Sequence, residues 1–216
     1  MPWTCFPIPR TWKPFASWND KGNARAVKSI CVYASSSEAV DHQYRDIAHR
    51  LGELITEHGH TLIYGGGCVG LMGVCARAVH ACGDGRVVGV ITDKLVDLEL
   101  AYQEADELVV TETMSERKRI MAERADAFIA LPGGFGTLEE VMEILVLKQL
   151  WYHEKPCVFI NVNGIYDHLF HFFDALIAEH FIKESHKAFF HVCTTAEDAY
   201  AYLERYEPGP VHGKWF

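Results

Sequence analysis

The segment 127–141, with the sequence AFIALPGGFGTLEEV, constrains the fold more than any other part of the chain. Its first five residues, 127–131, are typical of a buried β-strand, and Pro132 is followed by three glycines in four residues. Thr137 occupies an expected helix N-cap position, and Glu140 follows three residues later, as in a capping box. A strand, a tight glycine turn and a helix start aim backbone N–H groups at an anion. Because the loop lacks the lysine of the nucleoside-triphosphatase P-loop, it predicts a site for a single phosphate with an acidic residue one helical turn away.

The composition is that of an ordinary α/β domain and argues against several classes of protein. The chain has 216 residues, of which 49% are hydrophobic and 23% charged, enough for one domain with a sizeable core. No apolar run reaches the roughly 18 residues that span a membrane, and the N-terminus lacks the continuous apolar core of a signal peptide. The net charge of −9 disfavours a nucleic-acid partner. The seven cysteines include no CxxC pair and the histidines no HExxH set, so we expect a cytoplasmic protein without a metal site.

Short apolar segments alternate with longer amphipathic ones along most of the chain. The expected strands are 30–34, 61–64, 86–91, 107–111, 126–131, 156–161 and 188–193. The expected helices are 38–58, one from the glycine-rich loop to about 81, 114–124, 137–150, 166–181 and 195–205. This alternation is typical of βαβ units, so we predict an α/β, modified Rossmann-like, three-layer α-β-α fold with a mostly parallel sheet of about seven strands. The single domain is expected over residues 28–206, between an irregular N-terminal extension at 1–27 and a C-terminal tail at 207–216.

In a parallel sheet, the loops that follow the strands meet at one edge, and ligands bind there. The first such loop, 34–37, contains Ser36, whose hydroxyl suits a phosphate or a ribose. Alternatively, the serines of this loop only cap the next helix.

The second loop, 65–73, reads GGGCVGLMG and also lies between a strand and a helix. It contains the GxGxxG dinucleotide fingerprint at Gly65, Gly67 and Gly70, with Asp93 as a plausible acid at the end of the next strand. This pattern makes an NAD(P)-dependent oxidoreductase an alternative function. The fingerprint follows the second expected strand rather than the first, however, and glycines at these positions also suit close helix–strand packing. Both interpretations stay open on the residues alone.

A basic cluster of Arg117, Lys118 and Arg119 lies in the segment MSERKRIMAERAD, just before the motif strand. A solvated helix face, with i,i+4 pairing to residues such as Glu123, explains such a cluster without a ligand. Because this helix leads into the strand before the glycine turn, its start can reach the same sheet edge. Arg117 or Lys118 would then meet a phosphate or a carboxylate there.

Taken together, these motifs resemble a known family. Met114-x-x-Arg117-Lys118, followed by ADAFIALPGGFGTLEE, is similar to the paired signature of the Lonely Guy family of cytokinin riboside 5′-monophosphate phosphoribohydrolases, some relatives of which carry a lysine decarboxylase label. The segments GGGCVGLMG, GVI and INVNGIYD also resemble the family, over about residues 27–203. The resemblance implies a modified Rossmann fold, a homodimer, and hydrolysis of the N-glycosidic bond of a cytokinin nucleotide or AMP to a free base and ribose 5-phosphate.

The resemblance also implies roles for individual residues. Arg117 and Glu140 match the catalytic pair. With the loops considered above, the expected substrate-binding residues are Gly133, Gly134, Gly136, Thr137, Lys118, Met114, Glu139, Ser36 and Gly66. No metal or redox cofactor is required, and no pyridoxal-phosphate site with a Schiff-base lysine is recognisable. Two departures from the family pattern, Ser115 in place of His and Thr92 in place of Pro, bear on base preference and loop shape.

Two further alternatives concern activity and assembly. A non-enzymatic nucleotide or cofactor carrier of the same fold would bind a phosphate compound without turnover, so release of a base from AMP discriminates it from the hydrolase. The apolar stretch VMEILVLKQLWY, which includes Trp151, is either the surface of the expected homodimer, near the site, or a buried helix.

Overall fold

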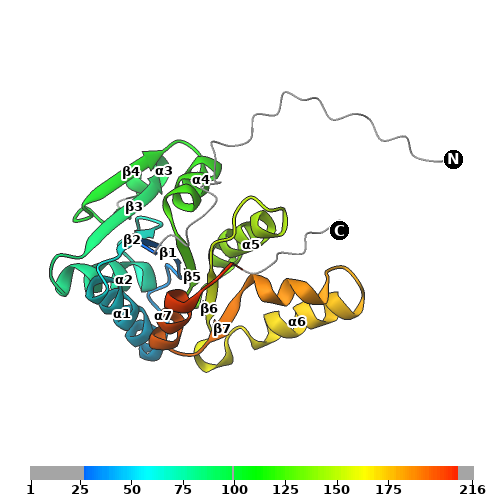
Figure 1. Cartoon of the computed structure of the whole chain (residues 1–216). Coiled ribbons are helices and arrows are strands. Elements are labelled where there is room, and N and C mark those ends of the chain that lie inside the picture. The colour runs from blue at the N-terminus through cyan, green and yellow to red at the C-terminus, as the bar shows by residue number, and fades with distance from the viewer. Residues whose placement is uncertain (1–26, 99, 209–216) are drawn as a thin grey trace.

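The computed structural model describes residues 27–98 and 100–208, in which strands and helices alternate along the chain (Figure 1). The strands are β1 (Ser29–Tyr33), β2 (Thr61–Tyr64), β3 (Arg86–Thr92), β4 (Glu107–Thr111), β5 (Ala127–Ala130), β6 (Cys157–Ile160) and β7 (His191–Cys193). The α-helices are α1 (His42–Glu57), α2 (Gly70–Ala81), α3 (Asp93–Asp97), α4 (Met114–Arg124), α5 (Phe135–Gln149), α6 (Asp167–Ala178) and α7 (Ala196–Arg205). Two 3₁₀ turns, η1 (Val162–Gly164) and η2 (Glu184–Phe189), flank α6. The expected N-terminal extension and C-terminal tail lie outside the described residues, apart from 27, 207 and 208.

The strands form one seven-stranded sheet in the order β4-β3-β2-β1-β5-β6-β7. Every neighbouring pair is parallel, from Val88 opposite Glu107 at one side to Ile160 opposite Cys193 at the other. The chain builds outward from β1 to β4 and then returns to place β5 on the other side of β1. The predicted α/β Rossmann-like fold with a parallel sheet of seven strands is therefore confirmed, and its strand order reverses between β1 and β5.

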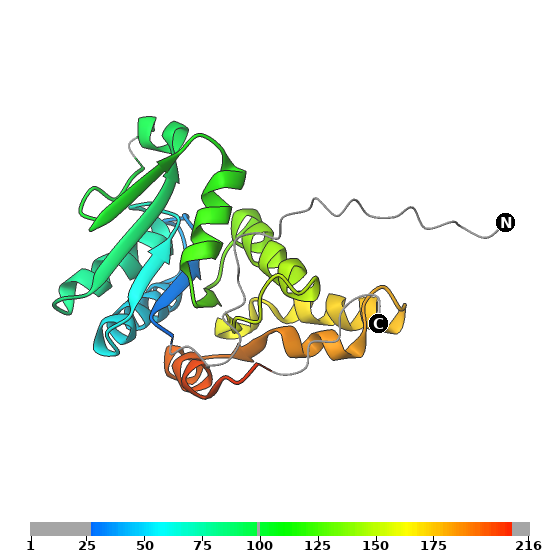
Figure 2. The same cartoon turned by 45° about the horizontal axis from the view of Figure 1, so that its top comes forward.

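Helices cover both faces of this sheet, as Figures 1 and 2 show. Alternate residues of β1 face opposite sides, because side chains in a strand alternate. Ile30 and Val32 join a core with residues of α1, α2 and α7. Cys31 and Tyr33 join a second core with residues of α4 and α5, against which α6 packs. The result is the expected three-layer arrangement.

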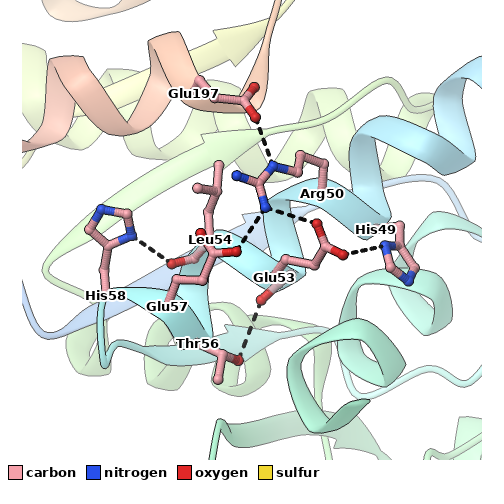
Figure 3. Close-up of polar contacts among 9 residues, drawn as sticks. His49, Arg50, Glu53, Leu54, Thr56, Glu57, His58 and Glu197 are labelled. Atoms are coloured by element: carbon pink, nitrogen blue, oxygen red, sulfur yellow. Dashed lines mark hydrogen bonds and ion pairs between the residues drawn. The ribbon is translucent and has the colours of Figure 1, made fainter. Parts of the chain in front are cut away.

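The outer side of α1 is tied to α7 by a surface network of charges (Figure 3). The Arg50 guanidinium contacts Glu197 of α7 at 2.7 Å and Glu53 and Glu57 of its own helix, each at 2.9 Å. These side chains are substantially exposed, so we assign the network little of the stability. It lies on the α1 and α7 side of the sheet, whereas α4 and α5, which carry the candidate site, cover the other side.

Several expected boundaries are confirmed to the residue, including 61–64, 107–111 and 114–124. The first helix begins at His42 rather than 38, because the Asp41 carboxylate accepts a hydrogen bond from the N–H of Gln43 at 3.0 Å and caps it there. The idea that the serines of loop 34–37 cap this helix is thus wrong. The short helix α3 was not expected. Within residues 27–98 and 100–208, no helix is both long and apolar enough to traverse a bilayer.

Candidate active site

The strand order reverses between β1 and β5, so the carboxyl ends of these two strands mark the switch point of the sheet. In open α/β sheets this is where ligands bind, because the loops after the two strands turn away from each other. Here the loops are held close at their bases, since the N–H of Ser35 donates to the carbonyl of Pro132 at 3.2 Å. The two turns expected to bind phosphate or ribose therefore lie at one edge of the sheet.

The glycine turn after β5 leads directly into α5. Gly134 is the N-cap, the helix begins at Phe135, and no side chain caps it. The expectation that Thr137 is the N-cap of a capping box with Glu140 is therefore wrong. The helix begins two residues earlier, and Thr137 lies within its first turn. Without a side-chain cap, the first backbone N–H groups of α5 remain available to an external acceptor.

The three glycines of this turn serve two different purposes. Gly133 packs against Thr137, because an added Cβ would lie 2.0 Å from the Thr137 hydroxyl oxygen. A Cβ on Gly134 or Gly136, in contrast, meets no described atom within 4 Å. Both of these glycines are exposed, and Phe135 between them is 94% exposed. The backbone at the start of α5 is thus open on the side where an anion would approach.

Arg117 and Glu140 form a buried ion pair beside this turn. Nη1 of Arg117 donates to Oε1 of Glu140 at 2.6 Å, and the two side chains are only 7% and 11% exposed. Nε of Arg117 also donates to the carbonyl of Val90, in β3, at 2.8 Å. The guanidinium from α4 is therefore fixed at two points and presents a fixed positive charge to the acid of α5.

The ionisation of Glu140 reflects two opposing effects. Burial raises the pKa of Glu140 above its ordinary value, while the charge and hydrogen bond of Arg117 act to lower it. Burial is the larger effect, so the pKa stays raised. A carboxylate held in this way is a stronger base than an exposed glutamate.

Lys118 faces the same helix but contacts different acids. Its Nζ forms ion pairs with Glu139 and, at 2.7 Å, with Glu143. Desolvation acts to lower the pKa of Lys118, but the hydrogen bonds to the two glutamates outweigh it and the pKa is raised. Met114, one turn earlier on α4, is 48% exposed. Arg117 and Lys118 of α4 thus meet the first turns of α5 through three ion pairs.

The loop 65–73 lies on the other side of β1, and its helix start is already occupied. The N–H of Gly70 donates to the Glu38 carboxylate at 3.0 Å, and the N–H of Leu71 donates to the Ser35 carbonyl at 2.9 Å. A pyrophosphate at this helix would have to displace a carboxylate of its own charge. The dinucleotide interpretation of the fingerprint is therefore not favoured by the geometry.

The remaining predicted residues of this region line the same edge. Gly66, which has a φ of +74°, accepts a hydrogen bond at its carbonyl from the N–H of Tyr102 at 2.8 Å. Ser36 is exposed, and its backbone lies 2.4 Å from where a Cβ on Gly70 would be. Asp93, the proposed ribose partner of a dinucleotide, instead begins α3 and accepts from the N–H of Lys94 at 2.6 Å.

Two residues of the site were not singled out from the sequence. Tyr166 donates its hydroxyl hydrogen to the carbonyl of Leu131 at 2.7 Å and so fixes the end of β5 before the glycine turn. It belongs to the segment INVNGIYD, and that match to the family was the available signal. Glu143 gave no signal apart from its position one helical turn after Glu139.

Comparison with known proteins is consistent with this geometry. A family model described as "Possible lysine decarboxylase" matches residues 72–203. The chain is 41% identical over 187 residues to the probable cytokinin riboside 5′-monophosphate phosphoribohydrolase LOGL5 of Oryza sativa subsp. japonica, covering 87% of this chain and 76% of the relative. It is 40% identical over 181 residues to the cytokinin riboside 5′-monophosphate phosphoribohydrolase LOG5 of Arabidopsis thaliana, covering 84% and 79%.

Solved structures resemble the chain at lower sequence identity. The molybdenum cofactor carrier protein of Chlamydomonas reinhardtii aligns with a TM-score of 0.64 at 24% identity, covering 82% of this chain and 96% of that protein. The molybdenum cofactor binding protein of Rippkaea orientalis aligns with a TM-score of 0.63 at 22% identity, covering 82% and 94%. At such identities the likeness shows a common fold and nothing about the ligand.

Proposed function

The chain belongs to the Lonely Guy family of cytokinin riboside 5′-monophosphate phosphoribohydrolases, and on that premise we propose that it hydrolyses the N-glycosidic bond of a nucleoside 5′-monophosphate. The substrate is a cytokinin riboside 5′-monophosphate or AMP, and the products are the free base and ribose 5-phosphate. The observation that carries this proposal is the buried pair of Arg117 and Glu140, one helical turn from the uncapped glycine start of α5.

The chemistry of the bond explains why these groups are suitable. Cleavage of a ribosyl C–N bond builds positive charge on the sugar, and a carboxylate beside the anomeric carbon stabilises that charge and orients or deprotonates water. We assign this role to Glu140. The departing base carries the electron pair of the broken bond and takes up, directly or through solvent, the proton that water loses when its oxygen bonds to the sugar. Arg117 stays charged at neutral pH, so it stabilises charge and holds Glu140 rather than donating a proton.

The phosphate does not react in this proposal but anchors the substrate. We place it at the N–H groups of Gly134, Phe135 and Gly136, where the helix dipole also favours an anion. Lys118, Glu139, Met114, Ser36 and Gly66 then contact the remainder of the nucleotide. Binding energy from the phosphate fixes the sugar against Glu140, which is how a remote group accelerates a reaction it does not enter.

We expect adenosine to be a poor substrate compared with AMP. Without the phosphate, the anchor at α5 is lost, and kcat/KM should fall by at least about 10²-fold. The measurement is chromatographic detection of adenine released from each compound at equal concentration. Inorganic phosphate should inhibit AMP hydrolysis competitively, whereas equal rates on adenosine and AMP would remove the phosphate from the proposal. AMP binding without any release of adenine would favour the carrier.

In the pH profile of kcat/KM, we expect the midpoint of the acidic limb to lie above the ordinary pKa of a glutamate. Glu140 acts as the ionised form, so activity is lost as the pH falls through its raised pKa. Five other titratable side chains interact electrostatically with the Glu140 carboxyl: Arg117, Glu139, Lys118, Tyr33 and Cys31. A pH profile with AMP measures the limb. An acidic limb at or below pH 4.5, the ordinary pKa of a glutamate, would show that Glu140 is not the group that limits the rate.

We further propose a homodimer in the cytoplasm, with no nucleic-acid or membrane partner. The apolar stretch 141–152 is partly buried and partly exposed. Val141 and Ile144 lie in the core, whereas three later apolar side chains are about half exposed: Val146 at 49%, Leu150 at 41% and Trp151 at 51%. Exposed apolar side chains gathered at the end of α5 and just after it suit contact with a second copy. Sedimentation equilibrium tests the dimer.

A further inference from the structure

The first glycine after β2 lies against the candidate catalytic arginine. Gly65 follows Tyr64 directly, and its backbone does not need glycine for its conformation: in this loop the left-handed φ values occur at Gly66 and Gly70. The reason for glycine at position 65 must therefore be the space that a side chain would occupy.

That space is filled by the Arg117 guanidinium. A Cβ on Gly65 would lie 2.1 Å from Nη2 of Arg117 and 3.4 Å from its Cζ. The Sδ atom of Met72, in α2, lies 3.2 Å from the same Cβ position. Carbon and nitrogen atoms that are not bonded cannot approach this closely, so either the loop or the guanidinium would have to move.

The guanidinium has little freedom to move without loss of its bonds. Its Nε is bonded to the Val90 carbonyl at 2.8 Å and its Nη1 to Glu140 at 2.6 Å. The planar fork keeps these nitrogens in fixed relative positions, and the side chain is 7% exposed. A shift of about 1 Å away from position 65 would therefore lengthen at least one of the two bonds beyond hydrogen-bond distance.

We propose that Gly65 is a positioning residue for the hydrolytic reaction: the absence of a side chain there lets Arg117 reach Glu140 and the β3 carbonyl at the same time. This role rests on the function proposed above. It gives the glycine-rich loop a purpose within the active site other than phosphate binding. It also explains how a segment far from α4 and α5 in the sequence controls the geometry of their ion pair.

The test is Gly65→Ala in the wild-type and Arg117→Lys backgrounds. In the wild-type background we expect kcat/KM for AMP to fall by about 10²-fold, because misplacement of a catalytic group by about 1 Å costs this much. The acidic limb should also move to higher pH, since Arg117 lowers the pKa of Glu140. Lysine has no second terminal nitrogen to meet the new Cβ, so Gly65→Ala should cause little further loss of kcat/KM or of thermal stability in the Arg117→Lys protein.

Urea unfolding of the four proteins gives a readout that needs no turnover. The proposal is supported if Gly65→Ala lowers the free energy of unfolding in the wild-type background but not in the Arg117→Lys background. It is also supported if the Gly65→Ala protein fails to fold and the double variant folds. Equal losses in the two backgrounds, or an unchanged acidic limb, would overturn it. If the wild-type protein hydrolyses no nucleotide, the proposed function fails. The unfolding comparison would still show whether a side chain at position 65 displaces the Arg117 guanidinium.

Discussion

Glu140→Gln lowers kcat for AMP by about 10²- to 10⁴-fold and leaves AMP binding within a few-fold of wild type; this is the result we expect for the acid of α5. Glutamine has the same shape, and its carbonyl oxygen can still accept from Nη1 of Arg117. It has no charge to stabilise the sugar and no basicity toward water. Single-turnover release of adenine measures the chemical step, and isothermal titration measures the binding of AMP.

A matched control separates this effect from the loss of any ion pair. Glu123 pairs with Arg119 on the surface of α4 at 2.8 Å, and the two side chains are 36% and 48% exposed. Glu123→Gln should leave kcat unchanged and alter the free energy of unfolding by less than about 1 kcal/mol. Near-normal adenine release by the Glu140→Gln protein would contradict the assignment of Glu140 as the reacting acid.

The fold could be predicted from the sequence to the extent that it depends on local patterns. Apolar strands bounded by turns predicted β2 and β4 to the residue, and the charged segment 114–124 was predicted as the helix α4. The helix starts that were wrong, at 38 and at Thr137, both depended on a choice of cap. Asp41 competes successfully with the serines before it, and glycine at 134 allows α5 to begin without a side-chain cap. A single sequence does not say which of several possible caps is used.

Only those residues of the site that belong to the family motif could be predicted from the sequence. Arg117 and Glu140 were expected together on that ground, and the structure brings them within 2.6 Å. The contacts around them were not expected, because they join segments that are distant in sequence. Examples are the Glu38 carboxylate at the start of α2 and the Tyr166 hydroxyl on the Leu131 carbonyl. Such contacts depend on the strand order, which places β2 beside β1 and β6 beside β5.

Arg117→Met should lower both activity and stability, and the loss of stability should depend on pH. Methionine is about as long as the arginine stem but leaves Glu140 buried without a partner and the Val90 carbonyl without its donor. Removal of one member of a buried ion pair costs about 3–5 kcal/mol, and kcat/KM should fall by about 10²-fold or more. Chemical denaturation at several pH values and AMP hydrolysis measure the two effects.

The stability of the Arg117→Met protein should depend on pH in a direction set by the unpaired Glu140 carboxyl. Arg117 lowers the pKa of Glu140, so without Arg117 that pKa rises further in the folded protein. In the unfolded chain it stays at the ordinary glutamate value of 4.5. Between these two values the folded state binds more protons, so the stability of the variant falls as the pH rises. The difference from wild type should therefore be small in acid and largest above the folded-state pKa.

Arg117→Met combined with Glu140→Gln distinguishes the charge from the shape of the pair. The double variant has no lone buried charge, so it should regain most of the stability lost by Arg117→Met and remain inactive. A coupling free energy of about 1–3 kcal/mol in this cycle would identify the pair as a unit. Additive losses of stability, equal in acid and at neutral pH, would contradict it. The two charges would then be independent of each other, and Arg117 would have to be assigned to the substrate alone.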